Sequence, residues 1–120
     1  MTSINIKEKF ELFDDYWNPR IIGELNGQLV KIAKFKGEFE MHKHDREDEL
    51  FQVIKGAIQI EFEDRTETLN EGDMIVVPHG VMHKPSADQE AWVLMFEPAS
   101  TVNTGENKES ELTRDELDRI

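Results

Sequence analysis

The feature that most constrains the fold of this chain is a close succession of short β-forming runs, each ended by turn residues. These runs fill residues 50–97, with a turn at Gly56 between two of them. In one run Ile58, Ile60 and Phe62 alternate with polar residues, which gives the strand one apolar and one polar face. About eight or nine such strands predict an all-β fold, a double-stranded β-helix or jelly-roll barrel.

The turns and runs together predict where the strands lie. Asn26-Gly27 is the strongest turn signal, because this pair favours a two-residue hairpin turn. In chain order we expect strands over residues 21–23, 28–35, 50–55, 57–62, 65–69, 74–77, 83–85 and 91–97.

A short N-terminal helical arm is predicted before the first strand. Ile6, Phe10 and Phe13 recur at helical spacing, with Asn5 or Ser3 available as the N-cap. We expect the apolar face of this arm to cover an open end of the barrel or a partner subunit.

The C-terminal end is predicted to be a polar tail that finishes in a second short helix. Thr113 and Glu116 form a capping box, which favours a helix over Thr113–Ile120. We therefore expect one domain in three parts: residues 1–36 as arm and first strands, 37–97 as the barrel core, and 98–120 as the tail.

Composition limits the partners and the compartment. The chain has 120 residues, a net charge of −12 and no cysteine. The negative charge repels phosphate backbones and anionic lipid surfaces, so we expect neither nucleic acid nor membrane as a partner. The N-terminal residues lack an apolar signal core, and we expect a cytoplasmic protein. Without cysteine, any metal ion must be held by nitrogen and oxygen atoms.

Two of the four histidines stand at a spacing that suits a metal site. His42 and His44 are two residues apart, so on an extended strand both imidazoles point to the same face. Glu49 then opens the next β-forming run and could face the same pair from a neighbouring strand. A second segment, which begins at Gly72, leads through a Pro-His-Gly turn to His83.

These two segments resemble the paired motifs of a small single-domain cupin. The first reads Gly37-x4-His42-x-His44-x4-Glu49-x6-Gly56, and the second reads Gly72-x5-Pro78-x-Gly80-x2-His83. The first gap is one residue shorter than the usual motif, and Ala87 stands where the second motif commonly ends in asparagine. Neither departure changes a ligand position. The resemblance implies a jelly-roll barrel and a metal site.

The ligand set implied by these motifs is His42, His44, Glu49 and His83. Three imidazoles and one carboxylate suit a single divalent transition metal, namely Fe, Mn, Ni, Co or Zn. Glu47 is a weaker substitute for Glu49, because only Glu49 leads directly into a strand. His79 lies at a turn tip, where we expect a solvated side chain rather than a ligand.

The sequence predicts a ligand pocket but no catalytic residue. Parity from Glu49 points Phe51 and Val53 toward the site, and Trp92 or Phe96 on the closing strand could line it. No Ser/His/Asp arrangement or phosphate loop is present, so acid–base work would fall to Glu49 or to a water on the ion.

The open coordination positions of such an ion suit two functions. The first is metal-dependent chemistry, oxygenation or isomerisation, on a small oxygen-bearing metabolite by a dioxygenase or isomerase. The alternative is a non-catalytic cupin that binds or senses a small molecule. In either case we expect a homodimer, because short cupin chains resemble subunits that pair edge strands.

Overall fold

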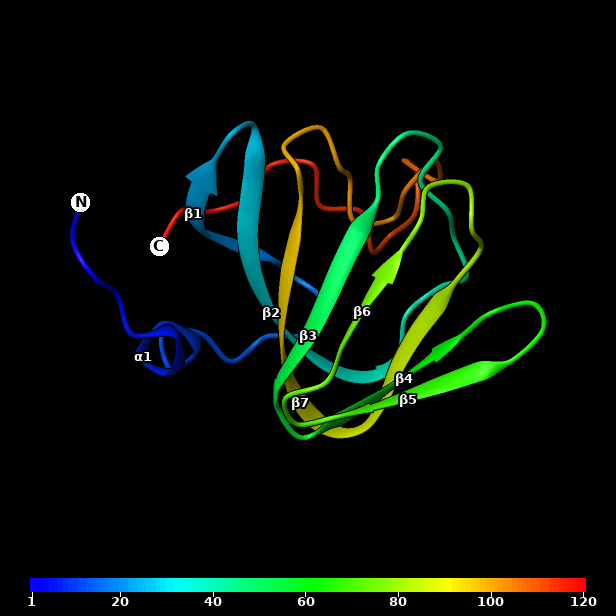
Figure 1. Cartoon of the computed structure of the whole chain (residues 1–120), viewed down its shortest axis with the longest axis horizontal. Coiled ribbons are helices and arrows are strands. Elements are labelled where there is room, and N and C mark those ends of the chain that lie inside the picture. The colour runs from blue at the N-terminus through cyan, green and yellow to red at the C-terminus, as the bar shows by residue number, and fades with distance from the viewer.

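Antiparallel strands make up most of the regular backbone of this protein, in a computed structural model that describes residues 1–120 (Figure 1). The strands pack as two facing layers that enclose a core, as the all-β jelly-roll prediction requires. In chain order the elements are α1 (Ile6–Phe10), β1 (Arg20–Leu25), β2 (Gln28–Glu38), β3 (Glu49–Lys55), β4 (Ala57–Glu61), β5 (Thr66–Asn70), β6 (Met74–Val77) and β7 (Lys84–Pro98). The predicted fold class is confirmed.

The longest strand, β7, joins the two layers. Its C-terminal part lies between β2 and β3 in the sheet order β1-β2-β7-β3-β6, while its first residues pair with β4. Figure 1 shows β7 curving from the β4–β5 hairpin up into the larger sheet. The strands predicted over residues 83–85 and 91–97 are therefore parts of one 15-residue strand. Seven strands are present, fewer than expected.

The hairpin predicted between the first two strands is confirmed. Asn26 and Gly27 both have positive φ, 53° and 76°, as a type I′ turn requires. The turn sets Leu25 opposite Gln28. This register points alternate residues of β2 into the barrel, among them Ala33 and Phe35.

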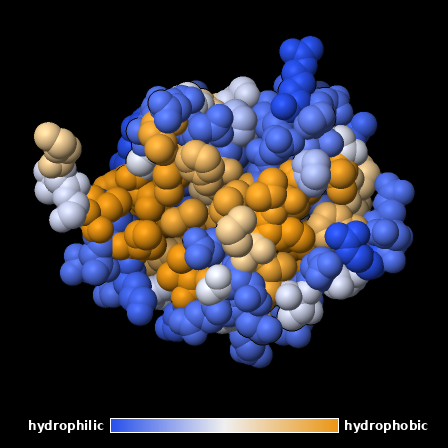
Figure 2. Space-filling model, viewed as in Figure 1, coloured by the Kyte–Doolittle hydropathy of each residue, from blue (hydrophilic) through white to orange (hydrophobic).

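Apolar side chains from both layers fill the barrel interior. The innermost have no exposed surface: Ala33, Val53, Ile58, Ile60, Ala91 and Val93. On β7 the buried residues alternate with half-buried ones, so one face of this strand is interior and the other is exterior. Apolar residues also gather on the exterior face of the larger sheet, where Figure 2 shows a band of them across the front.

The N-terminal helix packs on this exterior face. Asn5 caps it, accepting a hydrogen bond from Glu8 N at 3.0 Å. Phe10 is fully buried and stacks on Trp92 with ring centroids 4.8 Å apart. The helix is confirmed, but it covers the outside of the sheet rather than an open end of the barrel. No helix has the length and apolar character needed to cross a membrane.

The predicted C-terminal helix is wrong. These residues form no helical turn, and Arg119 forms a parallel bridge with Ile21 of β1. The Thr113 hydroxyl hydrogen-bonds with the Thr104 hydroxyl at 2.6 Å instead of capping a helix. A helix this short is marginal. The backbone of these residues instead forms hydrogen bonds with Ile21 at the edge of β1, which a helix could not form.

Candidate metal centre

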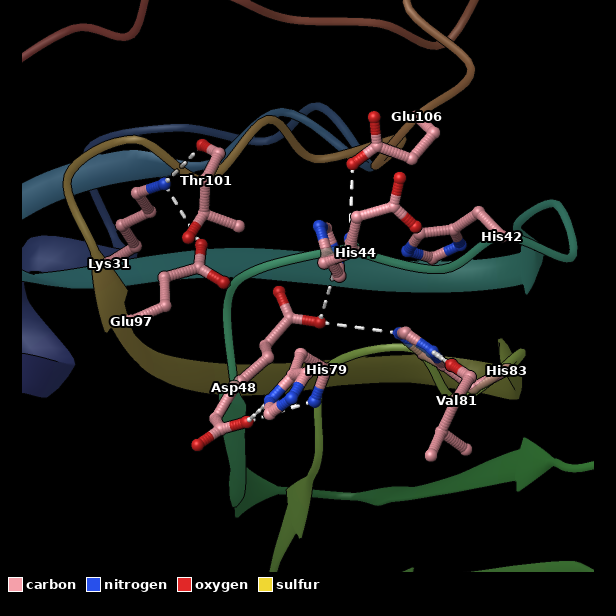
Figure 3. Close-up of polar contacts among 12 residues, drawn as sticks. Lys31, His42, His44, Asp48, His79, Val81, His83, Glu97, Thr101 and Glu106 are labelled. Carbon is pink, nitrogen blue, oxygen red and sulfur yellow. Dashed lines mark hydrogen bonds and ion pairs between the residues drawn. The ribbon is translucent and has the colours of Figure 1, made fainter.

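Four buried side chains from separate segments meet inside the barrel. His42 and His44 lie on the segment between β2 and β3, Glu49 is the first residue of β3, and His83 directly precedes β7. Their ligand atoms all lie within 4.8 Å of one another. These are the four ligand candidates named from the sequence, and Figure 3 shows His42, His44 and His83 lying close together.

The sequence predicted a strand for the two histidines of the first motif. They lie instead on a loop between β2 and β3. One isolated antiparallel bridge holds this loop, between His42 and His83. In it His42 N donates to His83 O at 3.0 Å, and His83 N donates to His42 O at 2.8 Å. The bridge fixes two ligands against each other, and their ring centroids are 4.3 Å apart.

Backbone carbonyls orient two of the imidazoles. His42 Nδ1 lies 2.9 Å from Glu40 O, and His83 Nδ1 lies 2.9 Å from Val81 O. Each Nδ1–H can donate to its carbonyl, which leaves Nε2 with a free lone pair for a metal ion. For His83 this nitrogen faces Glu49, with Nε2 3.3 Å from Oε1.

His44 has no such partner. Both of its ring nitrogens are buried without a hydrogen bond, although Nε2 lies 3.4 Å from Glu49 Oε1. A buried polar group without a partner costs about 1–3 kcal/mol, so its presence needs a reason. A metal ion bound by this nitrogen supplies one, and the donor set therefore fits a divalent transition metal.

The protonation states also suit metal binding. Burial, followed by the charge on His83, lowers the pKa of His42 to about 4. Burial opposes the ionisation of Glu49, but its contacts with Glu97, His44 and His83 outweigh burial and hold its pKa well below the usual range. Near neutral pH His42 is a neutral imidazole and Glu49 is an anion, which are the forms that bind a cation.

A second buried carboxyl, which the sequence interpretation missed, faces Glu49. Glu97, near the end of β7, is 2% exposed and accepts a hydrogen bond from Lys31 Nζ at 2.9 Å. Burial and the negative charge of Glu49 raise the pKa of Glu97 well above its usual range. The protonated carboxyl can therefore donate to Glu49 and orient it. The alternation of β7 could have predicted this position, because Glu97 follows Val93 and Met95 at every second residue on the interior face.

A pocket reaches this cluster from one side. Its lining includes His42, Glu49 and Glu97 at the metal end. The rest of the lining is mainly aromatic and apolar: Trp17, Pro19, Ala33, Phe35, Phe39, Phe51, Pro85, Met95 and Asn103. The cavity itself is narrow, with a volume of about 30 Å³. A space of this size holds only about two water molecules.

The pocket residues named from the sequence divide into three groups. Phe51 lines the pocket. Val53 points inward but is enclosed in the core, with no exposed surface. Trp92 and Phe96 are placed wrongly by the prediction. They lie on the exterior face of β7, because Met95 and its interior neighbours have the opposite parity.

The two side chains considered and set aside as ligands lie outside the cluster. Glu47 accepts a hydrogen bond from Ser100 Oγ at 2.8 Å in a polar groove. His79 is exposed, and its Nδ1 lies 2.9 Å from Asp48 Oδ1. Figure 3 shows this pair pointing away from the three clustered imidazoles.

The C-terminal tail packs beside the ligand loop. Gly105 fits against the carbonyl of Lys43, and a Cβ at this position would lie 1.9 Å from that oxygen. Glu106 N donates to the same carbonyl at 3.1 Å, and the Glu106 carboxylate accepts from Asp45 N at 3.1 Å. The tail therefore fixes the loop that carries His42 and His44.

Comparison with known proteins places the chain in a family. Residues 28–97 match the cupin domain family. A cupin-2 domain containing protein from Shewanella frigidimarina superposes with a TM-score of 0.78 and 45% identity, over 79% of this chain and 93% of that protein. Protein NMB1881 from Neisseria meningitidis superposes with a TM-score of 0.75 and 28% identity, over 81% of this chain and 99% of the other.

A curated relative agrees. Protein YdbB of Bacillus subtilis (strain 168) is 36% identical over 80 residues, which are 66% of this chain and 65% of YdbB. The match thus spans slightly less than two thirds of that relative. Since the family match covers more than half of the 120 residues, the chain belongs to the cupin domain family.

Proposed function

We propose that this cupin holds one divalent transition-metal ion, Fe, Mn, Ni, Co or Zn, through His42, His44, Glu49 and His83. We propose further that it carries out metal-dependent chemistry, oxygenation or isomerisation, on a small oxygen-bearing molecule. The observation that carries the proposal is His44, whose two buried nitrogens have no hydrogen-bond partner within the protein. A bound ion would polarise an oxygen donor of the substrate and offer it open coordination positions.

The residues of the chain have separate tasks in this proposal. The backbone bridge between His42 and His83 holds two ligands in place, and Glu40 O fixes the orientation of the His42 ring. Glu97 positions Glu49, while Lys31 neutralises part of the negative charge. The apolar pocket walls exclude water from the bond that reacts.

A specific observation supports the alternative, a cupin that binds or senses a small molecule without catalysis. The pocket offers few groups for proton transfer, because Glu97 is paired with Lys31 and the Asn103 amide is bonded to the C-terminal tail. Glu49 is itself a ligand candidate. A protein that only captures a chelating molecule needs no further acid or base.

Metal analysis followed by two reaction assays tests the proposal. Protein purified without added metal should contain close to one transition-metal ion per chain, and His44→Ala and His83→Ala should contain none. With Fe(II), a chelating substrate should cause oxygen uptake that is lost in Glu49→Ala. With Zn(II) or Ni(II), a keto sugar or keto acid should take up deuterium from heavy water.

Each outcome of these assays has a defined meaning. Full metal content in both histidine variants would refute the site. A ligand that raises the melting temperature, without oxygen uptake or deuterium exchange, would favour the binding function over both reactions.

A further inference from the structure

The side chain of Glu40 joins the C-terminal tail to the loop that carries His42 and His44. Its Oε2 accepts a hydrogen bond from Ser110 Oγ at 2.5 Å. Its Oε1 accepts a second one from Asn107 Nδ2 at 2.9 Å. The first distance is typical of a hydroxyl group that donates to a charged carboxylate. Both donors belong to the tail, so the tail holds this carboxylate at both of its oxygens.

The backbone of Glu40 makes the opposite connection, to the metal centre. Its carbonyl oxygen lies 2.9 Å from His42 Nδ1 and orients that imidazole. The residues on either side are held by backbone bonds, from Phe39 N to Pro85 O at 3.0 Å and from His42 N to His83 O at 3.0 Å. Glu40 itself forms no backbone–backbone hydrogen bond. Its side chain therefore provides the polar contacts that hold its carbonyl in place.

The part of the tail that contacts Glu40 is ordered by bonds of its own. Thr104 is fully buried, and its hydroxyl donates to Asn107 O at 2.7 Å. Leu112 N donates to Ser110 Oγ at 3.1 Å. These bonds position both donors independently of the carboxylate, so less conformational entropy is lost when the donors hold it.

The tail also touches the His42 ring directly. Gly105 lies so close to it that a Cβ at this position would be 3.2 Å from His42 Cδ2. The imidazole is thus bounded by the backbone of Gly105 and by the carbonyl of Glu40. A ligand side chain that is already fixed in one orientation loses less freedom when it binds an ion, and the affinity for the ion is higher for that reason.

We infer that Glu40 is a positioning residue of the metal centre, and that Asn107 and Ser110 of the tail act on the ion through it. Their two hydrogen bonds hold the Glu40 carbonyl against His42 Nδ1 and so raise the affinity for a divalent transition metal. The inference rests on the proposed function, because His42 must be a ligand. Loss of the partner that orients a ligating histidine typically costs about 10- to 100-fold in metal affinity.

Zinc affinity, measured by competition with a chromogenic chelator, tests the inference in three variants. Glu40→Ala removes both tail contacts and should weaken Zn(II) binding at least about tenfold. Glu40→Gln should stay close to wild type, because its amide can accept from Asn107 and donate to Ser110 Oγ. Glu38→Ala is the matched control. It removes an exposed carboxylate two residues away, which pairs with Lys84 and not with the tail, and it should leave the affinity unchanged.

Two further measurements separate positioning from a general loss of stability. Ser110→Ala should weaken zinc binding in the wild type but cause no further loss in Glu40→Ala, where the contact is already absent. In NMR spectra of the zinc-loaded protein, the His42 Nδ1 proton should exchange slowly with solvent in the wild type and in Glu40→Gln. It should exchange rapidly in Glu40→Ala, because the carbonyl that accepts it is no longer held.

The outcomes separate this inference from the metal site on which it rests. If the wild-type protein binds no zinc, the proposed function fails and the inference fails with it. If zinc binds equally well to Glu40→Ala, the metal site stands and Glu40 does not position it. If Glu40→Gln weakens binding as much as Glu40→Ala, the carboxylate acts through its charge, and the inference is wrong. Should Glu40→Ala fail to fold, unchanged zinc affinity in the double variant Asn107→Ala/Ser110→Ala would overturn the inference in the same way.

Discussion

Replacing His44 by leucine should stabilise the metal-free protein while abolishing its response to metal. His44 is 2% exposed, and both ring nitrogens lack hydrogen-bond partners. Leucine has a similar volume and no polar atoms, so His44→Leu removes two unpaired polar groups without opening a large cavity. The two nitrogens cost about 1–3 kcal/mol, and loss of the 3.4 Å contact between Nε2 and Glu49 Oε1 offsets part of this cost. We therefore expect a net gain of about 1 kcal/mol in the free energy of unfolding of the metal-free protein.

The metal should act in the opposite direction on the wild type alone. At a free Zn(II) concentration of 100 times the dissociation constant, binding adds about 2.7 kcal/mol to wild-type stability. For a chain of 120 residues this corresponds to a rise of about 10 °C in melting temperature. His44→Leu should show almost none of this rise, because it lacks one of four ligands.

Thermal unfolding by circular dichroism, with chelator and with Zn(II), measures both effects. His79→Leu is the control, because His79 is exposed and outside the cluster. It should retain the zinc response and gain no stability without metal. A less stable metal-free His44→Leu would refute the argument that the His44 nitrogens are uncompensated, and a retained zinc response would refute the ligand set.

Three further predictions follow from other parts of the molecule. Gly105→Ala should lower the free energy of unfolding, measured in urea, by several kcal/mol, because φ is +61° and the added Cβ would lie 1.9 Å from Lys43 O. Gly37→Ala is the control, since φ is +78° but no atom lies within 4 Å of the added Cβ, and it should cost only about 1 kcal/mol. Burial and the charge on His83 lower the pKa of His42 from 6.5 to about 4, so the unfolded chain binds more protons between these values. Metal-free stability should therefore fall by up to about 3 kcal/mol as the pH drops through this window, and a pH series of denaturation curves should show a smaller loss in His42→Gln. The homodimer stays a prediction, and light scattering should give a mass of about twice 14.0 kDa. Val76→Lys, on the exposed apolar edge strand β6, should reduce this mass to that of the monomer. A wild-type monomer at all concentrations would contradict the prediction.

Parity within a strand explains most of what the sequence predicted correctly. Phe51 and Val53 were placed by counting from Glu49, and both point inward. On β7 the same reasoning had no reference residue, and the large aromatic residues Trp92 and Phe96 were taken as interior. The interior series instead ends in an ionisable residue, Glu97, which its raised pKa and its contact with Lys31 make tolerable in the core.

Contacts between distant segments explain what the sequence could not predict. The Trp17 ring reaches the pocket because its backbone and indole bond to carbonyls of β2. Nothing near Trp17 in the sequence indicates a positive φ. The C-terminal helix failed for a related reason. Local capping signals at Thr113 competed with backbone pairing to β1 and with the hydroxyl of Thr104, neither of which is local.

An apolar core that extends well beyond the site explains how this small barrel tolerates its unsatisfied groups. The main apolar cluster, which includes Val53, Ile60 and Val93, contains none of the four ligand candidates. Burial of these side chains stabilises the barrel, and we therefore expect the protein to fold without metal, unlike a zinc finger. The locally unfavourable features, the unpaired nitrogens of His44 and the positive φ of Trp17, both belong to the site. A fold that does not depend on its metal can retain such features at the point of ligand binding, because their cost is subtracted from a stability that the core supplies independently.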